Sequence, residues 1–245
     1  MAATLPPPPA LDTLLAERKV ALFLDFDGTL VDIAPTPDEI DVPGDLVARL
    51  HALCERMDHR VALVSGRALD DLEAHLPAIR VCRAGSHGAS RLLADGARLG
   101  KEPTGLPDGA VAELRAFAER EGLLYETKAH GGALHFRQSP DSREAAVRRG
   151  HEIADAFGLD LFTGKGIVEL VRPGANKGEA VRAFMETASF ADALPVFLGD
   201  DTTDEDGMEA VRAYGGFGIA VGERESAMAR YALDSVAAVH HWLGL

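Results

Sequence analysis

Residues 20–30 read Val-Ala-Leu-Phe-Leu-Asp-Phe-Asp-Gly-Thr-Leu, and this stretch decides the fold. A short apolar run that ends at charge and glycine is typical of a strand buried in a parallel sheet. Side chains alternate along an extended chain, so the carboxyl groups of Asp25 and Asp27 are able to face the same way. Gly28 permits a tight turn directly after them. We therefore predict a buried strand with two carboxylates at its carboxyl end.

The segments on either side of the middle of the chain repeat this pattern. Apolar residues at helical spacing, such as Leu46, Leu50 and Leu53, alternate with further short apolar runs. The runs expected to be strands are residues 60–64, 81–84, 195–199 and 217–221. Because strands alternate with helices, we predict a right-handed parallel α/β sheet of the Rossmann-like type.

Residues 103–172 follow a different pattern. A helix, two alternating strands, a polar helix and two more strands predict a compact α+β unit, with hairpin turns at residues 130–132 and 164–166. Pro103 and Pro173 bound this unit. We therefore predict an α/β core made of residues 1–102 and 173–245, interrupted by an inserted α+β cap, or lid.

Composition excludes several classes of protein. The chain has 245 residues, with 25 Lys and Arg against 39 Asp and Glu, so its net charge is −14. That balance argues against a nucleic-acid binder, which needs a basic surface. No apolar run approaches the ~20 residues of a membrane span, and no secretory signal is evident. Cys54 and Cys82 are its only cysteines, too few for a disulfide framework, so we expect a cytoplasmic protein. We also expect a monomer that binds neither nucleic acid nor a membrane.

A second group of acids follows the apolar run at residues 195–199. Asp200, Asp201 and Asp204 stand directly after it. In open α/β sheets, ligands bind at the carboxyl ends of the strands, so these acids and the first pair are expected to converge. Such a group does not stay ionised without a cation. Ligands that are all oxygen point to Mg²⁺.

Two further polar side chains follow buried segments. Ser65 ends the run at residues 60–64, and Lys177 opens a helix. A hydroxyl and an ammonium are suited to binding phosphate oxygens. Together with a nucleophilic carboxylate and a metal, they predict phosphoryl transfer through an aspartyl-phosphate.

The ordered motifs resemble those of the haloacid dehalogenase superfamily, and more specifically its trehalose-6-phosphate phosphatase family. The segments that carry the superfamily resemblance are Asp25–Leu30, Ser65–Arg67, Lys177-Gly178 and Gly199–Glu205. The segments that carry the family resemblance are Gly85–Gly88, Glu126–Lys128, Ala133–Arg137, Val168–Leu170 and Gly178–Ala180. This resemblance runs from about Val20 to the C-terminus. It implies hydrolysis of trehalose 6-phosphate to trehalose and phosphate, with Mg²⁺ as cofactor.

The resemblance also implies a role for each acid of the core. Asp25 would be the nucleophile and a metal ligand. Asp27 would act as general acid and then general base, and its backbone carbonyl would bind Mg²⁺. Asp200 would be the third metal ligand. Asp201 and Asp204 would orient metal-bound waters or Lys177.

The phosphate and sugar contacts are implied in the same way. Ser65 and Lys177 would hold the phosphate. The residues implied to bind the rest of the substrate are His87, Arg67, Glu126, Lys128 and Glu169. Ser90 departs from the family pattern, in which an acid often stands at that position, so a sugar contact on the core side is in question.

Other functions remain open at this point. The substrate could be another sugar phosphate, such as sucrose phosphate or a mannosyl phosphoglycerate. A signalling receiver domain also combines clustered aspartates, a hydroxyl and a lysine, although it is about half as long and has no inserted cap. A third alternative is a catalytically silent scaffold that binds a disaccharide-phosphate synthase. Association with such a synthase is also compatible with catalysis.

Overall fold

The computed structural model describes residues 5–34, 39–101, 104–128, 130–164 and 166–245. The chain forms two compact units. The first, here called the core, consists of Met1–Lys101 and Asn176–Leu245, and the second, the cap, is Glu102–Ala175. The expected domain boundary at Pro103 lies outside the described residues. We retain as a proposal that residues 103–172 are a separate domain inserted into the core.

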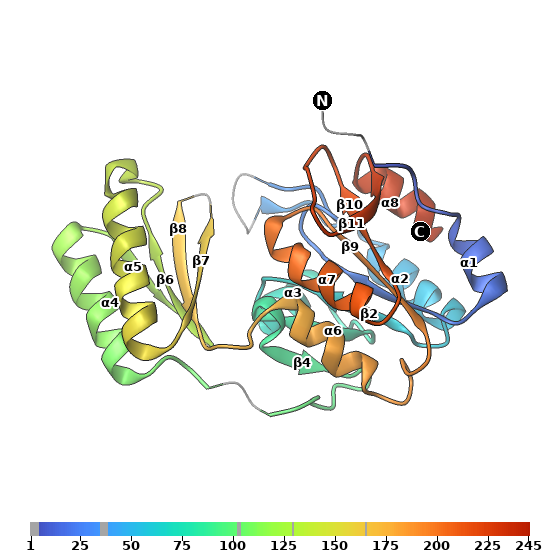
Figure 1. Cartoon of the computed structure of the whole chain (residues 1–245), viewed down its shortest axis with the longest axis horizontal. Coiled ribbons are helices and arrows are strands. Elements are labelled where there is room, and N and C mark those ends of the chain that lie inside the picture. The colour runs from blue at the N-terminus through green and yellow to red at the C-terminus, as the bar shows by residue number, and fades with distance from the viewer. Residues whose placement is uncertain (1–4, 35–38, 102–103, 129, 165) are drawn as a thin grey trace. The chain divides into compact units, whose positions relative to one another are not determined.

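The core is built on a seven-stranded sheet, and the strand predicted before Asp25 is the central one (Figure 1). In sheet order its strands are β11 (Ala229–Leu233), β10 (Phe217–Val221), β9 (Leu194–Gly199), β1 (Val20–Leu24), β2 (Val61–Val64), β3 (Cys82–Gly85) and β4 (Ser90–Leu92). All neighbours pair in parallel except β3 and β4. This is the Rossmann-like fold that the sequence predicts.

Helices cover both faces of the core sheet. They are α1 (Leu11–Glu17), α2 (Leu46–Arg56), α3 (Leu69–His75), α6 (Lys177–Met185), α7 (Glu205–Ala213) and α8 (Val236–Leu243). Alternate side chains of β1 enter the two apolar layers: Leu22 packs with residues of α1, α2, α3 and α8, whereas Phe23 packs with residues of α6 and α7. Every residue of β1 is fully buried, as an apolar run in a two-faced parallel sheet requires.

The phenylalanine cluster between β1 and α6 fixes one of these layers. The rings of Phe23, Phe184 and Phe190 lie with their centroids 5.6–6.4 Å apart, within the range of favourable aromatic pairs. Because Asp25 follows β1 and Lys177 begins α6, this packing holds two of the predicted site residues in register.

The cap is a four-stranded antiparallel sheet with two helices on one face (Figure 1). Its elements are α4 (Asp108–Glu121), β5 (Leu124–Thr127), β6 (Gly131–His135), α5 (Arg143–Phe157), β7 (Asp160–Gly164) and β8 (Ile167–Val171). The sheet order is β5-β6-β8-β7. Pairing between β6 and β8 joins the two predicted hairpins into one sheet.

The first cap hairpin differs in detail from the expectation. Gly131 and Gly132 belong to strand β6 rather than to the turn. A Cβ on Gly131 would lie 2.5 Å from the Leu170 carbonyl oxygen, and one on Gly132 would lie 2.6 Å from the Tyr125 hydroxyl oxygen. These glycines therefore allow close packing within the sheet, which a turn interpretation of the glycine pair overlooks. In the part of the chain that the structure describes, no helix is both long and apolar enough to cross a membrane.

Candidate active site

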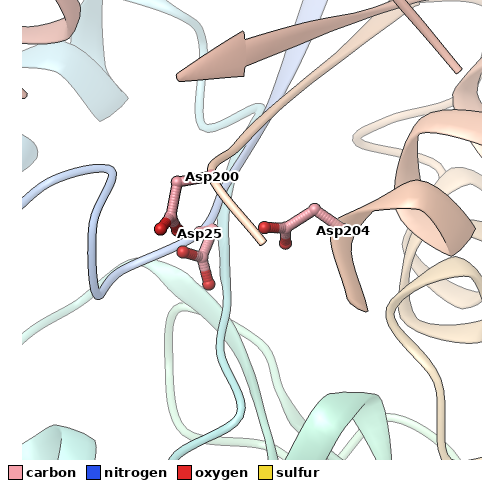
Figure 2. Close-up of side chains that lie close together, drawn as sticks. All are labelled: Asp25, Asp200 and Asp204. Atoms are coloured by element: carbon pink, nitrogen blue, oxygen red, sulfur yellow. The ribbon is translucent and has the colours of Figure 1, made fainter. Parts of the chain in front are cut away.

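Three carboxylates meet at the carboxyl edge of the core sheet. Asp25 follows β1 and Asp200 follows β9, and these strands pair in parallel with Leu24 opposite Leu198. Asp204 ends a short 3₁₀ turn, Thr202–Asp204. Figure 2 shows the three side chains, and each offers a carboxylate oxygen within 4.8 Å of the others. The central position of β1 beside β9 thus brings together acids that are 175 positions apart in sequence.

Burial and nearby negative charge disfavour the ionised forms of Asp25 and Asp200. Burial raises the pKa of Asp25 well above its ordinary value, against the opposing charge of Lys177, and Asp204 and Asp200 add to the rise. Burial also raises the pKa of Asp200 to about 6, and the negative charge of Asp204 adds to that rise. Carboxylates in such surroundings need cations to remain charged. The site has the electrostatic character of a cation site.

The residues present fit a hard divalent cation. The donors are carboxylate oxygens, which Mg²⁺ prefers. Gly28 leaves the space in front of Asp200 open: its φ is +81°, and a Cβ there would lie 2.3 Å from the Asp200 carboxyl carbon. The turn after Asp27 therefore passes directly against Asp200, as a shared ligand cradle would require. Asp25 and Asp200 are the carboxylates that would hold Mg²⁺, and the Asp27 carbonyl remains a proposed third ligand.

Asp204 has a different set of contacts. Its Oδ1 accepts from Lys177 Nζ at 2.5 Å, and its Oδ2 accepts from the backbone N–H of Asp201 at 2.8 Å. Asp201 in turn accepts from the N–H of Thr202. Because both Asp204 oxygens bond within the protein, its position agrees with the expected role of orienting Lys177. That role remains a proposal.

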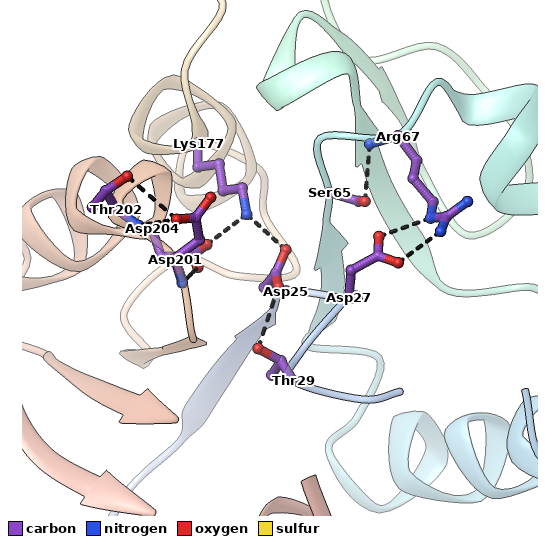
Figure 3. A network of polar contacts seen from close by, with 9 residues as sticks. All are labelled: Asp25, Asp27, Thr29, Ser65, Arg67, Lys177, Asp201, Thr202 and Asp204. Carbon is purple, nitrogen blue, oxygen red and sulfur yellow. Dashed lines mark hydrogen bonds and ion pairs between the residues drawn. The ribbon is translucent and has the colours of Figure 1, made fainter. Parts of the chain in front are cut away.

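Lys177 bridges the nucleophile candidate and the second acid cluster (Figure 3). Its Nζ donates to Asp25 Oδ1 at 2.6 Å, and the side chain is 3% exposed. Burial alone would lower the pKa of Lys177, but Asp204 and Asp25 raise it above its ordinary value. Asn176 caps the helix by accepting from Glu179 N–H at 2.8 Å, which fixes where α6 begins. The two carboxylates thus favour the charged form of Lys177 beside Asp25.

Asp27 faces away from this cluster and pairs with Arg67. The Arg67 guanidinium donates through Nε and Nη2 to the two Asp27 oxygens, both at 2.7 Å (Figure 3). Its Nη1 donates to Asp71 at 2.8 Å. A bidentate pair of this kind fixes the plane of a carboxylate. Arg67 therefore orients Asp27 in this structure, and its expected direct contact with the substrate remains a proposal.

Ser65 and His87 lie together at the ends of β2 and β3. Ser65 is fully buried, and its hydroxyl oxygen accepts from the Arg67 N–H at 3.1 Å. His87 donates its backbone N–H to the Ser65 carbonyl, and a Cβ on Gly66 would lie 2.8 Å from the His87 ring. Ser86 and His87 both have positive φ, 49° and 55°. Such strain costs about 1–3 kcal/mol per residue and tends to occur at functional sites.

The three predicted sugar-binding residues of the cap lie on or beside its sheet. Glu126 is on β5, Glu169 is on β8, and Lys128 follows β5. Lys128 Nζ donates to Glu169 Oε2 at 2.6 Å. Glu126 Oε2 lies 2.8 Å from His135 Nε2. The structure thus joins two of these residues directly and pairs the third with a histidine.

Sequence reasoning missed three partners in these networks. Thr29 donates its hydroxyl to Asp25 Oδ2 at 3.2 Å, Asp71 holds the far side of Arg67, and His135 contacts Glu126. The spacing of Arg67 and Asp71 by four residues is a signal that could have revealed that pair. The Thr29–Asp25 contact lies within one motif and the His135–Glu126 contact joins the two strands of one hairpin, so both are close in sequence, but neither side-chain pairing follows from the hydrophobic pattern.

The fold of this chain is shared by solved haloacid dehalogenase-like structures. A solved haloacid dehalogenase-like hydrolase from B. subtilis aligns with a TM-score of 0.70 and 15% identity, covering 93% of this chain and 99% of its own. A second solved structure, the C-terminal domain of C. albicans trehalose-6-phosphate phosphatase, aligns with a TM-score of 0.78 and 22% identity over 100% of both chains. At these identities the two structures show the fold alone.

Sequence comparison then gives the family. The sequence model of the trehalose-phosphatase family matches residues 23–237. Trehalose-6-phosphate phosphatase from Escherichia coli strain K12 is 35% identical over 241 residues, which cover 96% of this chain and 89% of the relative. This chain belongs to the trehalose-phosphatase family and is a phosphatase.

Proposed function

We propose that this phosphatase hydrolyses trehalose 6-phosphate to trehalose and inorganic phosphate, with Mg²⁺, through a phosphoryl group carried by Asp25. The observation that carries the proposal is that the buried Asp25 and Lys177 lie together with the partly buried Asp200 in a chain of the trehalose-phosphatase family. Family membership favours an enzyme over the receiver-like and scaffold alternatives. The E. coli relative supports the substrate.

The first half of the proposed reaction transfers phosphorus to the protein. An Asp25 carboxylate oxygen attacks phosphorus, the bond between phosphorus and the sugar oxygen breaks, and Asp27 gives that oxygen a proton. Lys177 and the Ser65 hydroxyl hold the phosphoryl oxygens. Mg²⁺, when bound, would neutralise charge on the phosphoryl group and on the carboxylates. Since Lys177 already contacts Asp25 at 2.6 Å, it is placed to offset part of that charge.

The second half regenerates the enzyme. Asp27 takes a proton from a water molecule, the water oxygen attacks phosphorus, and the bond between phosphorus and Asp25 breaks to release phosphate. The bidentate contact with Arg67 holds the Asp27 carboxylate in one orientation. Arg67 therefore supports Asp27 as a positioning residue in this proposal.

Specificity in the proposal comes from hydrogen bonds to the sugar hydroxyls. Glu126, Lys128 and Glu169 on the cap and His87 on the core would bind the trehalose part. Polar groups that a wrong sugar leaves unpaired penalise that sugar more strongly than a lost apolar contact does. Association with a trehalose-phosphate synthase, a monomeric state and a cytoplasmic location remain further proposals, and co-purification and sedimentation would address the first two.

A phosphate-release panel tests the proposed function. Trehalose 6-phosphate, sucrose 6-phosphate and glucose 6-phosphate are compared at equal concentration, with Mg²⁺ and with excess chelator. The proposal expects trehalose 6-phosphate to have the highest kcat/KM and chelator to stop the reaction. Preference for sucrose 6-phosphate would refute the substrate, and full activity in chelator would refute the metal.

A further inference from the structure

The cap sheet has one face that its helices leave uncovered. Helices α4 and α5 pack on the other face, against Leu134, Val168 and Leu170 (Figure 1). Side chains alternate along each strand, so the residues between these lie on the uncovered face. Residues Glu126, Ala133 and Glu169 form one rung across it, with Glu126 opposite Ala133 and Ala133 opposite Glu169.

Small residues on the central strand shape this face. Gly131 and Ala133 occupy two of its three positions on β6, so no bulky side chain separates Lys128 from Glu169. Lys128 therefore reaches across to Glu169, with Nζ 2.6 Å from Oε2. At the other end of β6, His135 Nε2 lies 2.8 Å from Glu126 Oε2. Two charged or polar pairs thus lie on either side of the buried Ala133.

The contact with Glu126 defines the chemistry of the His135 ring. Beside an ionised Glu126 carboxylate, which only accepts hydrogen bonds, Nε2 would be the donor of this pair. In the neutral ring, Nδ1 is then an acceptor. Among the described residues the His135 side chain has no hydrogen bond or ion pair besides the one to Glu126. An acceptor on this face is left for a ligand or solvent.

Stability does not explain this pair. The His135 and Glu126 side chains are 33% and 46% exposed, and exposed pairs of this kind contribute about 0–1 kcal/mol. A sugar hydroxyl, by contrast, both donates and accepts hydrogen bonds. The Glu126 carboxylate and the imidazole acceptor are able to accept a hydrogen bond from such a hydroxyl, and Lys128 Nζ supplies a donor within the same sheet.

We propose that His135 is a specificity-determining residue for the phosphorylated sugar. It orients the Glu126 carboxylate through Nε2–H and accepts a hydrogen bond from a sugar hydroxyl at Nδ1. This inference rests on the proposed function, because it takes the substrate to be a sugar phosphate that the cap binds. It adds a residue to the three cap positions expected from sequence.

The test compares a sugar substrate with a small ester that has no sugar. We would measure KM and kcat of wild type, His135→Ala and His135→Gln with trehalose 6-phosphate and with p-nitrophenyl phosphate. In His135→Ala the ratio of kcat/KM for the two substrates should fall at least about tenfold, mainly through a higher KM for the sugar phosphate. His135→Gln should recover part of this loss, because its amide N–H is able to donate to Glu126. The matched control is His151→Ala, which removes an exposed histidine of α5 in the same unit.

The inference is overturned if the ratio in His135→Ala stays within twofold of wild type. It is also overturned if both substrates lose activity equally, because that result indicates damage to the fold. Failure of the proposed function is separately visible: wild type would then cleave p-nitrophenyl phosphate but not trehalose 6-phosphate. In that case the ratio of kcat/KM is measured between p-nitrophenyl phosphate and the best substrate among hexose and disaccharide phosphates. If the wild type turns over none of these sugar phosphates, the inference is overturned as well.

Discussion

At the scale of single residues, charge balance in a buried space governs the site. Asp25, which is 4% exposed, lies close to Lys177, Asp200 and Asp204, and Lys177 contacts both Asp25 and Asp204. One lysine does not offset three carboxylates, which is why burial and repulsion raise the pKa of both Asp25 and Asp200. A bound divalent cation would remove that imbalance. The consequences are measurable in activity and in stability.

Replacing the proposed nucleophile should stop the reaction. Asp25→Asn keeps the size and shape of the side chain but removes the anionic oxygen that attacks phosphorus, so we expect no turnover of trehalose 6-phosphate. Asp27→Asn should keep some activity and lose roughly 10²–10⁴-fold, the usual contribution of general acid–base catalysis. Phosphate release under single-substrate saturation measures both. Substantial hydrolysis by Asp25→Asn would remove Asp25 from the nucleophile role.

Stability should depend on pH and metal together. The pKa of Asp200 is raised from its ordinary value of 3.8 to about 6 in the folded chain, so between these values the folded state binds more protons than the unfolded state. The contribution of Asp200 to stability is therefore present at low pH and is lost as pH rises through about 6. Mg²⁺ binds the ionised form, so its effect has the opposite trend. Thermal unfolding should show a larger Mg²⁺-induced rise in Tm at pH 7.5 than at pH 5, and equal rises at the two pH values would contradict this account.

At the scale of elements, the turn after β1 is the tightest constraint on the site. Gly28 has φ +81° and no room for a Cβ beside Asp200. The backbone of the turn is also held by a hydrogen bond, in which Gly28 N–H donates to the Val31 carbonyl at 2.7 Å. The strand therefore delivers Asp25, and the turn keeps the space in front of Asp200 free. Both features depend on one residue without a side chain.

A single methyl group at this turn should uncouple metal binding from folding. Gly28→Ala would force the Asp200 carboxylate out of place, so we expect loss of the Mg²⁺-induced rise in Tm and at least about a 100-fold loss of kcat/KM. The matched control is Gly96→Ala, because Gly96 has a similar φ of +86° and nothing within 4 Å of its Cβ position. That variant should show only the backbone strain of about 1 kcal/mol. Similar behaviour of the two variants would mean that strain, rather than contact with Asp200, sets the effect.

The elements that could be predicted from sequence are those with uniform burial. Strands β1, β2, β9 and β10 are buried almost throughout and read as apolar runs. The edge strands β4 and β11 could not be predicted in this way, because both are only partly buried and neither is uniformly apolar. Gly131 and Gly132 were misassigned to a turn, since a glycine pair favours turns locally and only packing against Leu170 and Tyr125 explains its place in a strand.

The candidate site could likewise be predicted only in part from the sequence. Motif spacing was sufficient to group Asp25 with Asp200 and Lys177, because strand ends in a parallel sheet share one edge. The partner of Asp27 was not predictable, since Arg67 reaches it from another strand end 40 positions away. Side-chain pairing across elements depends on rotamers and distances that appear only once the sheet is assembled.

At the scale of the whole molecule, the two ends of the chain support the catalytic turn. His240 on α8 lies with Nε2 2.8 Å from the Leu30 carbonyl oxygen, 210 positions away. Arg49 contacts the other ring nitrogen at 3.4 Å. Trp242 donates its indole N–H to the Pro9 carbonyl at 2.8 Å. The C-terminal helix thus links the N-terminal segment to the turn that follows Asp25.

Removal of this link should weaken the fold more than the chemistry. His240→Ala loses a hydrogen bond to Leu30, worth about 1 kcal/mol, so Tm should fall by roughly 2–4 °C in a chain of this size. The matched control is His241→Ala, because His241 is the next residue along the chain and its side chain is exposed. Thermal unfolding and kcat of both variants provide the comparison. An equal fall in Tm for the two variants would show that the Leu30 contact has no particular importance.

The central claim is that phosphorus passes through Asp25. The most direct measurement is rapid acid quenching of the wild-type enzyme with Mg²⁺ and trehalose 6-phosphate labelled in its phosphoryl group, followed by peptide mapping. This account predicts a label that hydroxylamine removes, on the peptide that contains Asp25, and no label in Asp25→Asn. Label on a different residue, or catalytic turnover without labelled protein at any quench time, would contradict it.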